Sequence, residues 1–243
     1  QSNLIKVLGN AEVKTFGSDN QLKITTNYKV DIDSSDIDDE INNILYTDLI
    51  EFMPENIAYE DFVVNGDENK QAGIMSSIKV GPTIADDIKK NSFYAVFGSL
   101  IIVFLYILLR FKNWQFSLGA VSAVFHDVLV VLGIFSLTYS FMPFNMEINQ
   151  AFIAAVLTVI GYSLNDTVVV FDRIREYRNI NTSWELPRVV DSALNSTLSR
   201  TLNTSFTTLV VLISIFIFGG ESIRGFMFAL IVGVLIGTYS SVF

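Results

Sequence analysis

The chain has 243 residues, is 51% hydrophobic and has a mean hydropathy of +0.45, which is too apolar for an ordinary soluble domain of this length. Its net charge of −9 lies in residues 1–90, with 8 Lys against 17 Asp or Glu, while residues 91–243 hold 8 basic and 8 acidic side chains. No basic surface is available for phosphates, so we expect no nucleic-acid partner, and the lack of cysteine excludes disulfides and thiolate metal sites.

Residues 1–90 are predicted to form a small α/β domain. Segments 11–17 and 21–28 are strand-like and are separated by the turn-forming residues 18–20. A helix over 35–52 is predicted to begin at Ser35 as N-cap, with Asp38 at capping-box spacing. Residues 73–80 are predicted to return as a strand. The first residues have the pattern of a domain interior, so we expect the domain to be N-terminally incomplete.

Residues 91–243 are predicted to form a transmembrane domain. Five apolar segments are long enough to cross a bilayer, near 93–109, 114–141, 150–171, 198–218 and 223–243. The predicted fold class is therefore an α-helical polytopic membrane bundle with a small α/β extracytoplasmic domain at its N-terminus.

Lys and Arg in the short connections predict the orientation of the bundle. The connections after the first and third segments carry six basic residues, namely Arg110, Lys112, Arg173, Arg175, Arg178 and Arg188. Residues 142–149 and 219–222 carry none, and Arg224 follows just beyond. The basic connections are therefore expected in the cytoplasm, with residues 1–90 on the extracytoplasmic side.

Asp166 lies in the stretch GYSLNDTVVVFDRIREYR, between Asn165 and Thr167. About 16 residues at a rise of about 1.5 Å place this acid roughly 24 Å into its span. An acid near a helix centre costs about 2.5–3.5 kcal/mol on insertion scales. One interpretation is a carboxylate that caps or snorkels at the helix end. Because Asp172 and Arg173 already mark the boundary, we favour a functional acid, with Asn165 and Thr167 as supporting polar groups.

Arg200 is predicted to be the partner of Asp166. About 18 residues separate it from the outer end of its span, which places it roughly 27 Å deep, close to the depth of Asp166. The same helix carries a polar face made of Arg200, Asn203, Thr204, Thr207 and Thr208. A guanidinium that snorkels to the cytoplasm is the alternative. If the two residues pair, protonation of Asp166 would discharge the pair and let the helices shift.

His126 and Asp127 are adjacent titratable residues near the middle of the second span. They are candidates for a proton relay, with a packed neutral imidazole as the alternative for His126 and a structural hydrogen bond as the alternative for Asp127. Because adjacent helix residues do not face each other, we expect each to have its own partner. Gly233 and Gly237 form a GxxxG pair that lets helices pack closely.

The sequence contains no nucleotide-binding loop, metal-ligand cluster or nucleophile triad, so we expect no enzyme, no metal and no cofactor.

Several stretches in order resemble one family. They are VGPTIADDI, FHDVLVVLGIFSL, GYSLNDTVVVFDRIRE, LSRTLNTSFTTL and FGGESIRGFMFALIVGVLIGTYSS. Over residues 78–243 the chain resembles the SecF half of the SecDF protein-export factor, a member of the resistance-nodulation-division superfamily. Members of that family have six spans, and the first has no counterpart here. The resemblance places the acid of the ND motif at Asp166, the base of the SRT motif at Arg200, and the HD motif at His126 and Asp127.

The resemblance implies an accessory subunit of the Sec translocase in the bacterial cytoplasmic (inner) membrane. Such a subunit uses the proton-motive force to help pull preproteins across on the outer side. Its expected partners are a SecD-like half, the SecYEG channel and the translocating preprotein.

Two alternatives stay open. A small-molecule or lipid exporter of the same superfamily is disfavoured by the small outer domain, and a non-conducting structural subunit would not need a buried acid.

Overall fold

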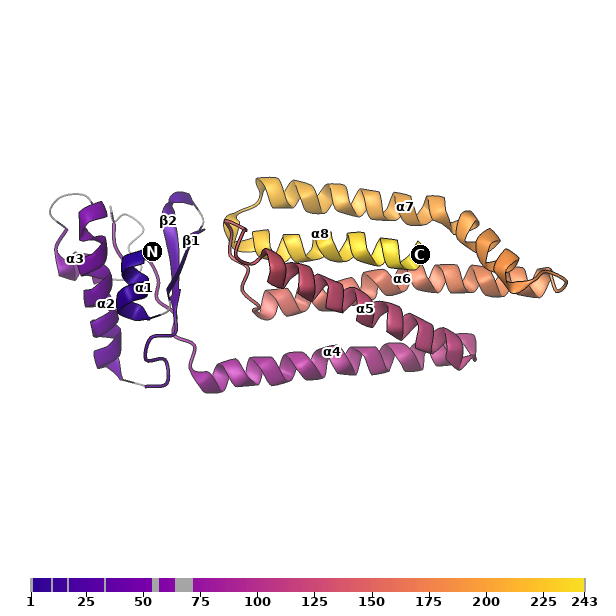
Figure 1. The fold of residues 1–243 in the computed structure, drawn as a ribbon, viewed down its shortest axis with the longest axis horizontal. Helices are drawn as coiled ribbons and strands as arrows, with labels where there is room; N and C mark the ends of the chain where they lie inside the picture. Colours follow the sequence, from indigo (N-terminus) through magenta and orange to yellow (C-terminus); the bar gives the residue numbers. More distant parts are fainter. Residues whose placement is uncertain are drawn as a thin grey trace. The chain divides into compact units, whose positions relative to one another are not determined.

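The computed structural model describes residues 2–9, 11–16, 18–32, 34–53, 57–63 and 72–242 (Figure 1). Contacts between residues divide the chain into two units. One comprises Gln1–Lys14 and Asn20–Lys89, and the other comprises Thr15–Asp19 and Lys90–Phe243.

The N-terminal unit combines short helices with a two-stranded sheet. In chain order its elements are α1 (Ser2–Leu8), β1 (Ala11–Phe16), β2 (Ser18–Thr26), α2 (Ser35–Leu49), the 3-10 helix η1 (Ile50–Phe52) and α3 (Tyr59–Val63). Leu4, Leu8 and Ala11 form its buried core, against which Ile44 and Leu45 of α2 pack. The apolar residues of α2 therefore bury one face, as their helical spacing predicts.

Three local predictions differ from the structure. The N-cap of α2 is Ser34 rather than Ser35, because the Ser34 hydroxyl accepts a hydrogen bond from the Asp36 amide at 3.3 Å. Ser18 begins β2 instead of forming a turn. Residues 73–80 do not form a strand: Ile78 is 84% exposed, and the Ile74 amide bonds the Phe62 carbonyl at 2.9 Å. Alternating apolar residues specify a strand only where a sheet edge and a buried face exist to receive them.

An ion pair between Lys29, which follows β2, and Glu40 connects the chain after β2 to α2. Lys29 Nζ lies 2.8 Å and 2.6 Å from the two carboxylate oxygens of Glu40, and the Tyr28 hydroxyl donates to Glu40 Oε1 at 2.7 Å. The hydrogen bond from Lys29, followed by that from Tyr28, lowers the pKa of Glu40 below its usual value. The carboxylate in turn raises the pKa of Lys29.

We predict that the amides of α2 are less protected from hydrogen exchange in acid, because the Glu40 contact is lost there. A carboxylate with a lowered folded pKa stabilises the fold above its unfolded pKa of about 4.3, and this stabilisation is lost as pH falls through the folded value. In Glu40→Gln the protection of α2 should no longer fall between neutral and acid pH. Near pH 7 its amides should exchange faster than those of the unchanged protein. Hydrogen exchange of α2 between pH 3 and 7, corrected for intrinsic rates, measures both effects. Glu51→Gln is the control, and equal profiles for the two variants would contradict the prediction.

The second unit contains five long helices, which confirms the predicted polytopic membrane bundle with a small α/β part. They are α4 (Pro82–Phe111), α5 (Trp114–Thr138), α6 (Gln150–Ile180), α7 (Leu186–Phe218) and α8 (Glu221–Val242). All five are long and apolar enough to span a membrane. The helices α4, α6 and α7 extend beyond the apolar segments of the sequence, because helix ends are set by caps and breakers such as Pro82 rather than by hydropathy.

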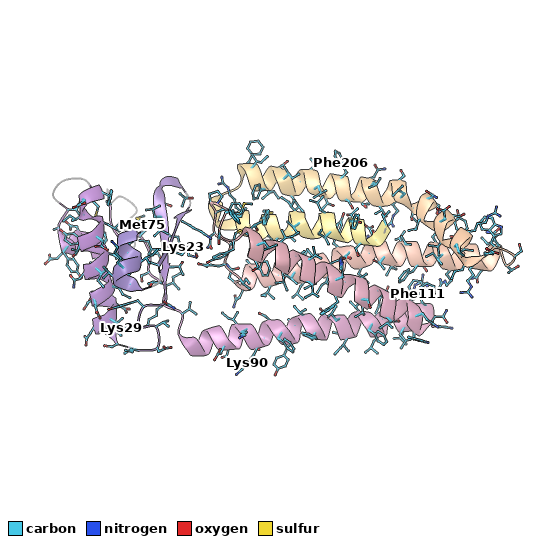
Figure 2. The ribbon with its side chains drawn as sticks, in the orientation of Figure 1. Lys23, Lys29, Met75, Lys90, Phe111 and Phe206 are labelled. Atoms are coloured by element: carbon cyan, nitrogen blue, oxygen red, sulfur yellow. The ribbon has the colours of Figure 1, made fainter. Side chains whose placement is uncertain are left out.

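Helix α6 is the centre of the bundle. In its most apolar window 44% of the residues are buried, against 11% for α4 and for α7. Figure 2 shows Phe206 projecting away from the bundle on α7, where it is 69% exposed. Such apolar side chains suit contact with lipid, since hydrocarbon does not penalise their exposure.

We call the end where α4 joins α5 and α6 joins α7 the basic end, because the six Lys and Arg residues of those connections lie there. Asp172 of α6 binds two of them, Arg110 of α4 at 3.0 Å and Arg175 at 3.1 Å. The rings of Phe111, Phe116 and Phe171 pack beside this charge cluster. Together these contacts fix the end of α4 to α6.

We call the other end the aromatic end, because a chain of five phenylalanines joins α5, α6, α7 and α8 there. Phe152 contacts Phe135 with ring centroids 4.3 Å apart, and Phe135 lies 6.4 Å from Phe228. Phe144, in the connection between α5 and α6, then lies 5.8 Å from Phe228 and 5.5 Å from Phe216. This end of the bundle is packed and apolar.

The two glycines of the GxxxG pair place α8 directly against α6. A Cβ on Gly233 would overlap the Val159 side chain, and one on Gly237 would lie 2.9 Å from Ser163 Cβ. The close approach of the two helices therefore requires the absence of a side chain at both positions.

We predict that Gly233→Ala destabilises the bundle by about 1–3 kcal/mol, because the methyl group forces α8 and Val159 apart. Gly133→Ala on α5 is the control, since nothing lies within 4 Å of the added Cβ. Alanine there should be neutral or stabilising by about 0.5–1 kcal/mol, from helix propensity. Thermal unfolding in detergent distinguishes the two. Equal midpoints for both variants would show that α6 and α8 do not need this close contact.

Candidate functional site

The eight buried polar or charged side chains that the structure describes all belong to the membrane helices. They are Ser117 and Asp127 on α5, Ser163, Asp166 and Thr167 on α6, and Thr197, Thr201 and Ser205 on α7. In hydrocarbon a polar group needs a partner inside the protein, so a cluster of this kind marks a functional or structural site.

Asp127 is fully buried, and both of its carboxylate oxygens have partners. Ser163 of α6 donates its hydroxyl to Oδ2 at 2.6 Å, and His126 Nδ1 lies 3.1 Å from Oδ1. The expectation that His126 and Asp127 have separate partners is therefore wrong for His126. Although adjacent Cβ atoms diverge, Nδ1 lies near the backbone and can reach a short neighbouring side chain. The His126 side chain is 60% exposed on the surface of α5.

Asp166 is as deeply buried as Asp127 but is not satisfied in the same way. It is 1% exposed, and its Oδ1 has no hydrogen-bond partner among the residues that the structure describes. The flanking residues do not supply one: Thr167 donates to the Ser163 carbonyl at 3.1 Å, and Asn165 is exposed on the bundle surface. Asp166 is thus an acid in the membrane interior with free hydrogen-bonding capacity.

Arg200 is the charged side chain that acts electrostatically on Asp166, but the two do not form an ion pair within 4.0 Å. Among the described residues Arg200 makes no salt bridge. The predicted pair is therefore not formed in this structure, and Arg200 is exposed. Nearby, Thr204 donates to the carbonyls of its own helix at 3.1 Å and 3.0 Å, and Asn203 is exposed.

The polar residues of α7 that face the bundle are partly different from those predicted. Thr197, Thr201 and Ser205 are buried, each four residues from the next. This i, i+4 stripe of small polar residues is a signal that sequence reasoning could have used. Ser163, which holds Asp127, was also missed, although it lies in the same motif as Asp166.

A hydroxyl cluster joins α6, α7 and α8 on the side of Asp166 toward the aromatic end. The Tyr162 hydroxyl lies 3.4 Å from both Ser205 Oγ and Thr208 Oγ1, and Ser205 Oγ lies 2.6 Å from Thr238 Oγ1. Tyr162 precedes Asp166 by four residues, so both lie on one face of α6. This face therefore presents the acid and the hydroxyl cluster to α7.

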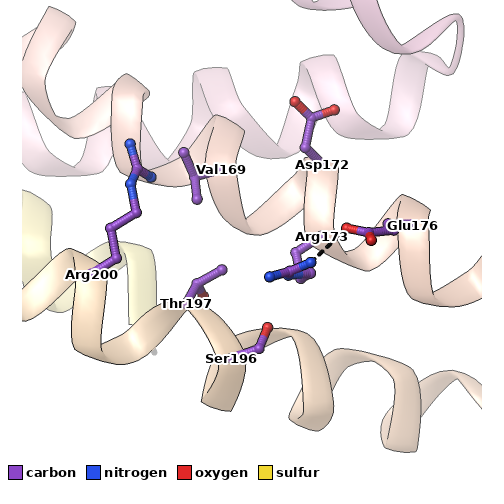
Figure 3. Close-up of a pocket in the computed structure, with 7 residues that line it drawn as sticks. All are labelled: Val169, Asp172, Arg173, Glu176, Ser196, Thr197 and Arg200. Carbon is purple, nitrogen blue, oxygen red and sulfur yellow. Dashed lines mark hydrogen bonds and ion pairs between the residues drawn. The ribbon is translucent and has the colours of Figure 1, made fainter.

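A pocket of about 240 Å³ lies between α6 and α7 on the other side of Asp166, toward the basic end (Figure 3). It is lined by Val169, Asp172, Arg173 and Glu176 of α6 and by Ser196, Thr197 and Arg200 of α7. Arg173 Nη1 bonds Glu176 Oε2 at 2.7 Å. Within the part of the chain that the structure describes, no three His, Asp or Glu side chains come together as a metal site requires.

The fold and the site define a class of protein: a membrane bundle with acidic and hydroxyl side chains buried in its interior. Residues 62–243 match the family model described as protein export membrane protein SecD/SecF, C-terminal. The chain therefore belongs to the SecD/SecF family.

Individual relatives agree with this assignment. The chain is 57% identical over 173 residues to protein translocase subunit SecF of Rhodothermus marinus, which covers 71% of this chain and 56% of that protein. It is 38% identical over 239 residues to SecF of Desulfurispirillum indicum, which covers 97% of this chain and 68% of that protein.

A solved structure agrees as well. The crystal structure of SecDF from Thermus thermophilus, titled a translocon-associated membrane protein, matches with a TM-score of 0.75 and 30% identity. The match covers 98% of this chain and 29% of that one. The chain spans about half the length of the SecF relative from Rhodothermus marinus.

We predict that Ser163→Ala destabilises the bundle by about 1–3 kcal/mol, because it removes a donor from a buried carboxylate. Thr158→Ala is the matched control on the same helix, since the Thr158 hydroxyl bonds the Ala154 carbonyl of its own helix at 2.8 Å. Thermal unfolding in detergent should show a lower midpoint for the serine variant only. Equal midpoints would mean that Asp127 does not depend on Ser163.

Proposed function

We propose that this chain is part of a SecF-type accessory subunit of the Sec translocase, driven by the proton-motive force to help move preproteins across the membrane. The observation that carries the proposal is Asp166, a fully buried acid near Arg200. Among the residues that the structure describes, one oxygen of Asp166 has no hydrogen-bond partner and Arg200 makes no ion pair. The names of the relatives, protein translocase subunits SecF and SecDF, supply the transport process.

The site has the parts that coupling of protons to movement requires. An ionised carboxylate without a partner is expensive in the membrane, so the open arrangement of Asp166 and Arg200 suits a neutral, protonated acid. When Asp166 loses its proton, the negative charge attracts the guanidinium, and α7 is pulled toward α6. Proton binding and release therefore alternate between two arrangements of α6 and α7. This is a coupling device rather than an enzyme.

The orientation follows from the charges at the helix ends. The basic end faces the cytoplasm, and residues 1–90 lie on the extracytoplasmic side of the bacterial inner membrane. One proton that crosses from the extracytoplasmic side to the cytoplasm releases about 2.3 kcal/mol per 100 mV from the membrane potential alone. The partners we propose are a SecD-like half, the SecYEG channel and the emerging preprotein.

The alternatives make different use of Asp166. A structural subunit of the Sec machinery would place no demand on the charge of this acid, so the unsatisfied Oδ1 argues against it. An exporter of small molecules or lipids would also need the acid, but names of the relatives favour protein export. The coupling ion we propose is H⁺, because a carboxylate beside an arginine is suited to protonation.

We predict that Asp166→Asn abolishes the gradient-dependent part of preprotein export and leaves gradient-independent export intact. Asparagine keeps the size of the side chain but removes its second charge state. The measurement is export into sealed vesicles with an imposed proton gradient, in the complete complex at equal expression. Asp191→Asn, which changes an exposed acid near the basic end of α7, is the control and should retain gradient dependence. If the Asp166 variant keeps full gradient dependence, the acid is structural.

A further inference from the structure

The pocket between α6 and α7 lies where the hydrocarbon core of a membrane would end. About 20 residues of helix, at a rise of about 1.5 Å each, cross a core about 30 Å thick. Counted from the start of α6 and from the end of α7, both at the aromatic end, the core extends to about residue 170 on α6 and about residue 198 on α7. The residues that line the pocket bracket both positions, at 169–176 on α6 and 196–200 on α7. The pocket therefore lies at the level of lipid headgroups.

The pocket opens on the surface of the bundle. Two of its lining residues on α7, Ser196 and Arg200, are exposed. At the same end of the bundle α5 begins at Trp114, whose side chain is 58% exposed. Exposed tryptophan is typical of the boundary between membrane and water, which agrees with the depth counted along the helices. A lipid that lies against α6 and α7 can therefore reach the pocket with its headgroup.

The pocket carries a net positive charge once its ion pairs are counted. Both carboxylates of the lining are bound: Asp172 by two arginines at 3.0 Å and 3.1 Å, and Glu176 by Arg173 at 2.7 Å. Arg200 also lines the pocket, and it makes no salt bridge with a residue that the structure describes. Four arginines therefore stand against two carboxylates, and the excess favours an anion.

The hydrogen-bond donors that the pocket offers to an anion belong to its arginines. Ser196 and Thr197 donate their hydroxyls to the Ala193 carbonyl at 2.8 Å and 3.0 Å, so these two protons are already used. Figure 3 shows Arg173 directed from α6 toward this part of α7. A guanidinium presents several N–H groups in one plane, an arrangement that matches the oxygens of a phosphate. Arg200 and the remaining N–H groups of Arg173 therefore suit a phosphate.

The surroundings of the pocket favour a phosphate that belongs to a lipid. Val169 gives the inner wall an apolar surface, and toward the membrane interior α7 exposes the apolar side chains of Leu202 and Val211. Hydrocarbon chains suit these side chains, whereas a free phosphate ion would gain nothing from them. Basic pockets between membrane helices on the cytoplasmic side are typical binding sites for anionic lipid headgroups.

We propose that the pocket between α6 and α7 binds the phosphate of an anionic phospholipid from the leaflet at the basic end, with Arg200 as its main ligand and Arg173 as the second. The binding of the lipid does not depend on the proposed function. One consequence does rest on it: if Asp166 couples proton movement, the lipid phosphate competes with the ionised acid for Arg200. A lipid in the pocket then favours the arrangement in which Asp166 and Arg200 are apart.

The test is a lipid titration of the complete complex after its own lipids have been removed in detergent. Native mass spectrometry counts the phosphatidylglycerol molecules that stay bound. Phosphatidylcholine, in which a cation compensates the same phosphate, should bind the pocket about tenfold more weakly. Arg200→Gln should weaken the binding of phosphatidylglycerol about tenfold, because it removes charge-assisted hydrogen bonds. Arg178→Gln changes an exposed arginine of α6 outside the pocket and is the control, which should bind like the unchanged complex.

A second pair of variants tests the pocket without a change of charge, and serves if Arg200→Gln does not assemble. Ser196→Phe fills the pocket and should prevent the binding of one phosphatidylglycerol, whereas Ser199→Phe, at an exposed position of α7 outside the pocket, should not. Equal binding by each variant and its control, or equal binding of the two lipids, would overturn the lipid site.

Two further outcomes would assign the pocket to something else. Displacement of the lipid by an excess of inorganic phosphate would make the free anion the ligand. If the unchanged complex retains no phosphatidylglycerol that depends on Arg200, a partner subunit covers the pocket. All of these readouts are made without a gradient or a preprotein. They can fail while Asp166 still proves essential for coupling, and they can succeed while it does not.

Discussion

A buried carboxylate in a membrane bundle has to find its hydrogen bonds within the protein, and the packing of this bundle depends on how Asp127 does so. Its bond to Ser163 at 2.6 Å joins α5 to α6 at mid-membrane. Ser163 in turn lies under Gly237 of α8, where a Cβ would be 2.9 Å away. One acid, one hydroxyl and one missing side chain therefore determine how three helices meet. The phenylalanines of the aromatic end pack between the same helices and hold them together there.

The two acids of the interior serve different purposes because their surroundings differ. Asp127 has partners on both oxygens, and its hydrogen bond with Ser163 connects α5 to α6. Asp166 has an oxygen without a partner among the described residues, an arginine nearby and a pocket within one turn. Its charge can therefore change without loss of an existing hydrogen bond. We accordingly propose a structural role for Asp127 and the coupling role for Asp166.

The helices and the interior charges were predictable from the sequence, since apolar length and the cost of a buried charge are properties of short segments. Asp127 and Asp166 stand out for that reason, and the structure buries both, whereas Arg200, which also stands out in the sequence, is exposed. The sequence did not reveal Ser163, Thr201 or the pocket, because their roles depend on how each helix is rotated about its axis and on which helix faces meet. The strand expected at 73–80 failed for a similar reason: its pattern is local, but the sheet edge that a strand needs is not.

Helix α7, which carries Arg200, is less buried in the bundle than α5, α6 and α8. Its most apolar window is 11% buried, against 33% for α5, 44% for α6 and 39% for α8. Its contacts with α6 at mid-depth include long hydroxyl distances of 3.4 Å at Tyr162. By contrast, α5 and α8 are fixed to α6 through Asp127 and the two glycines. An attraction between Arg200 and an ionised Asp166 would thus move α7 rather than the rest of the bundle. Since α7 and α8 are joined by the short turn at Gly219 and Gly220, such a movement would also reach α8 at the aromatic end of the bundle.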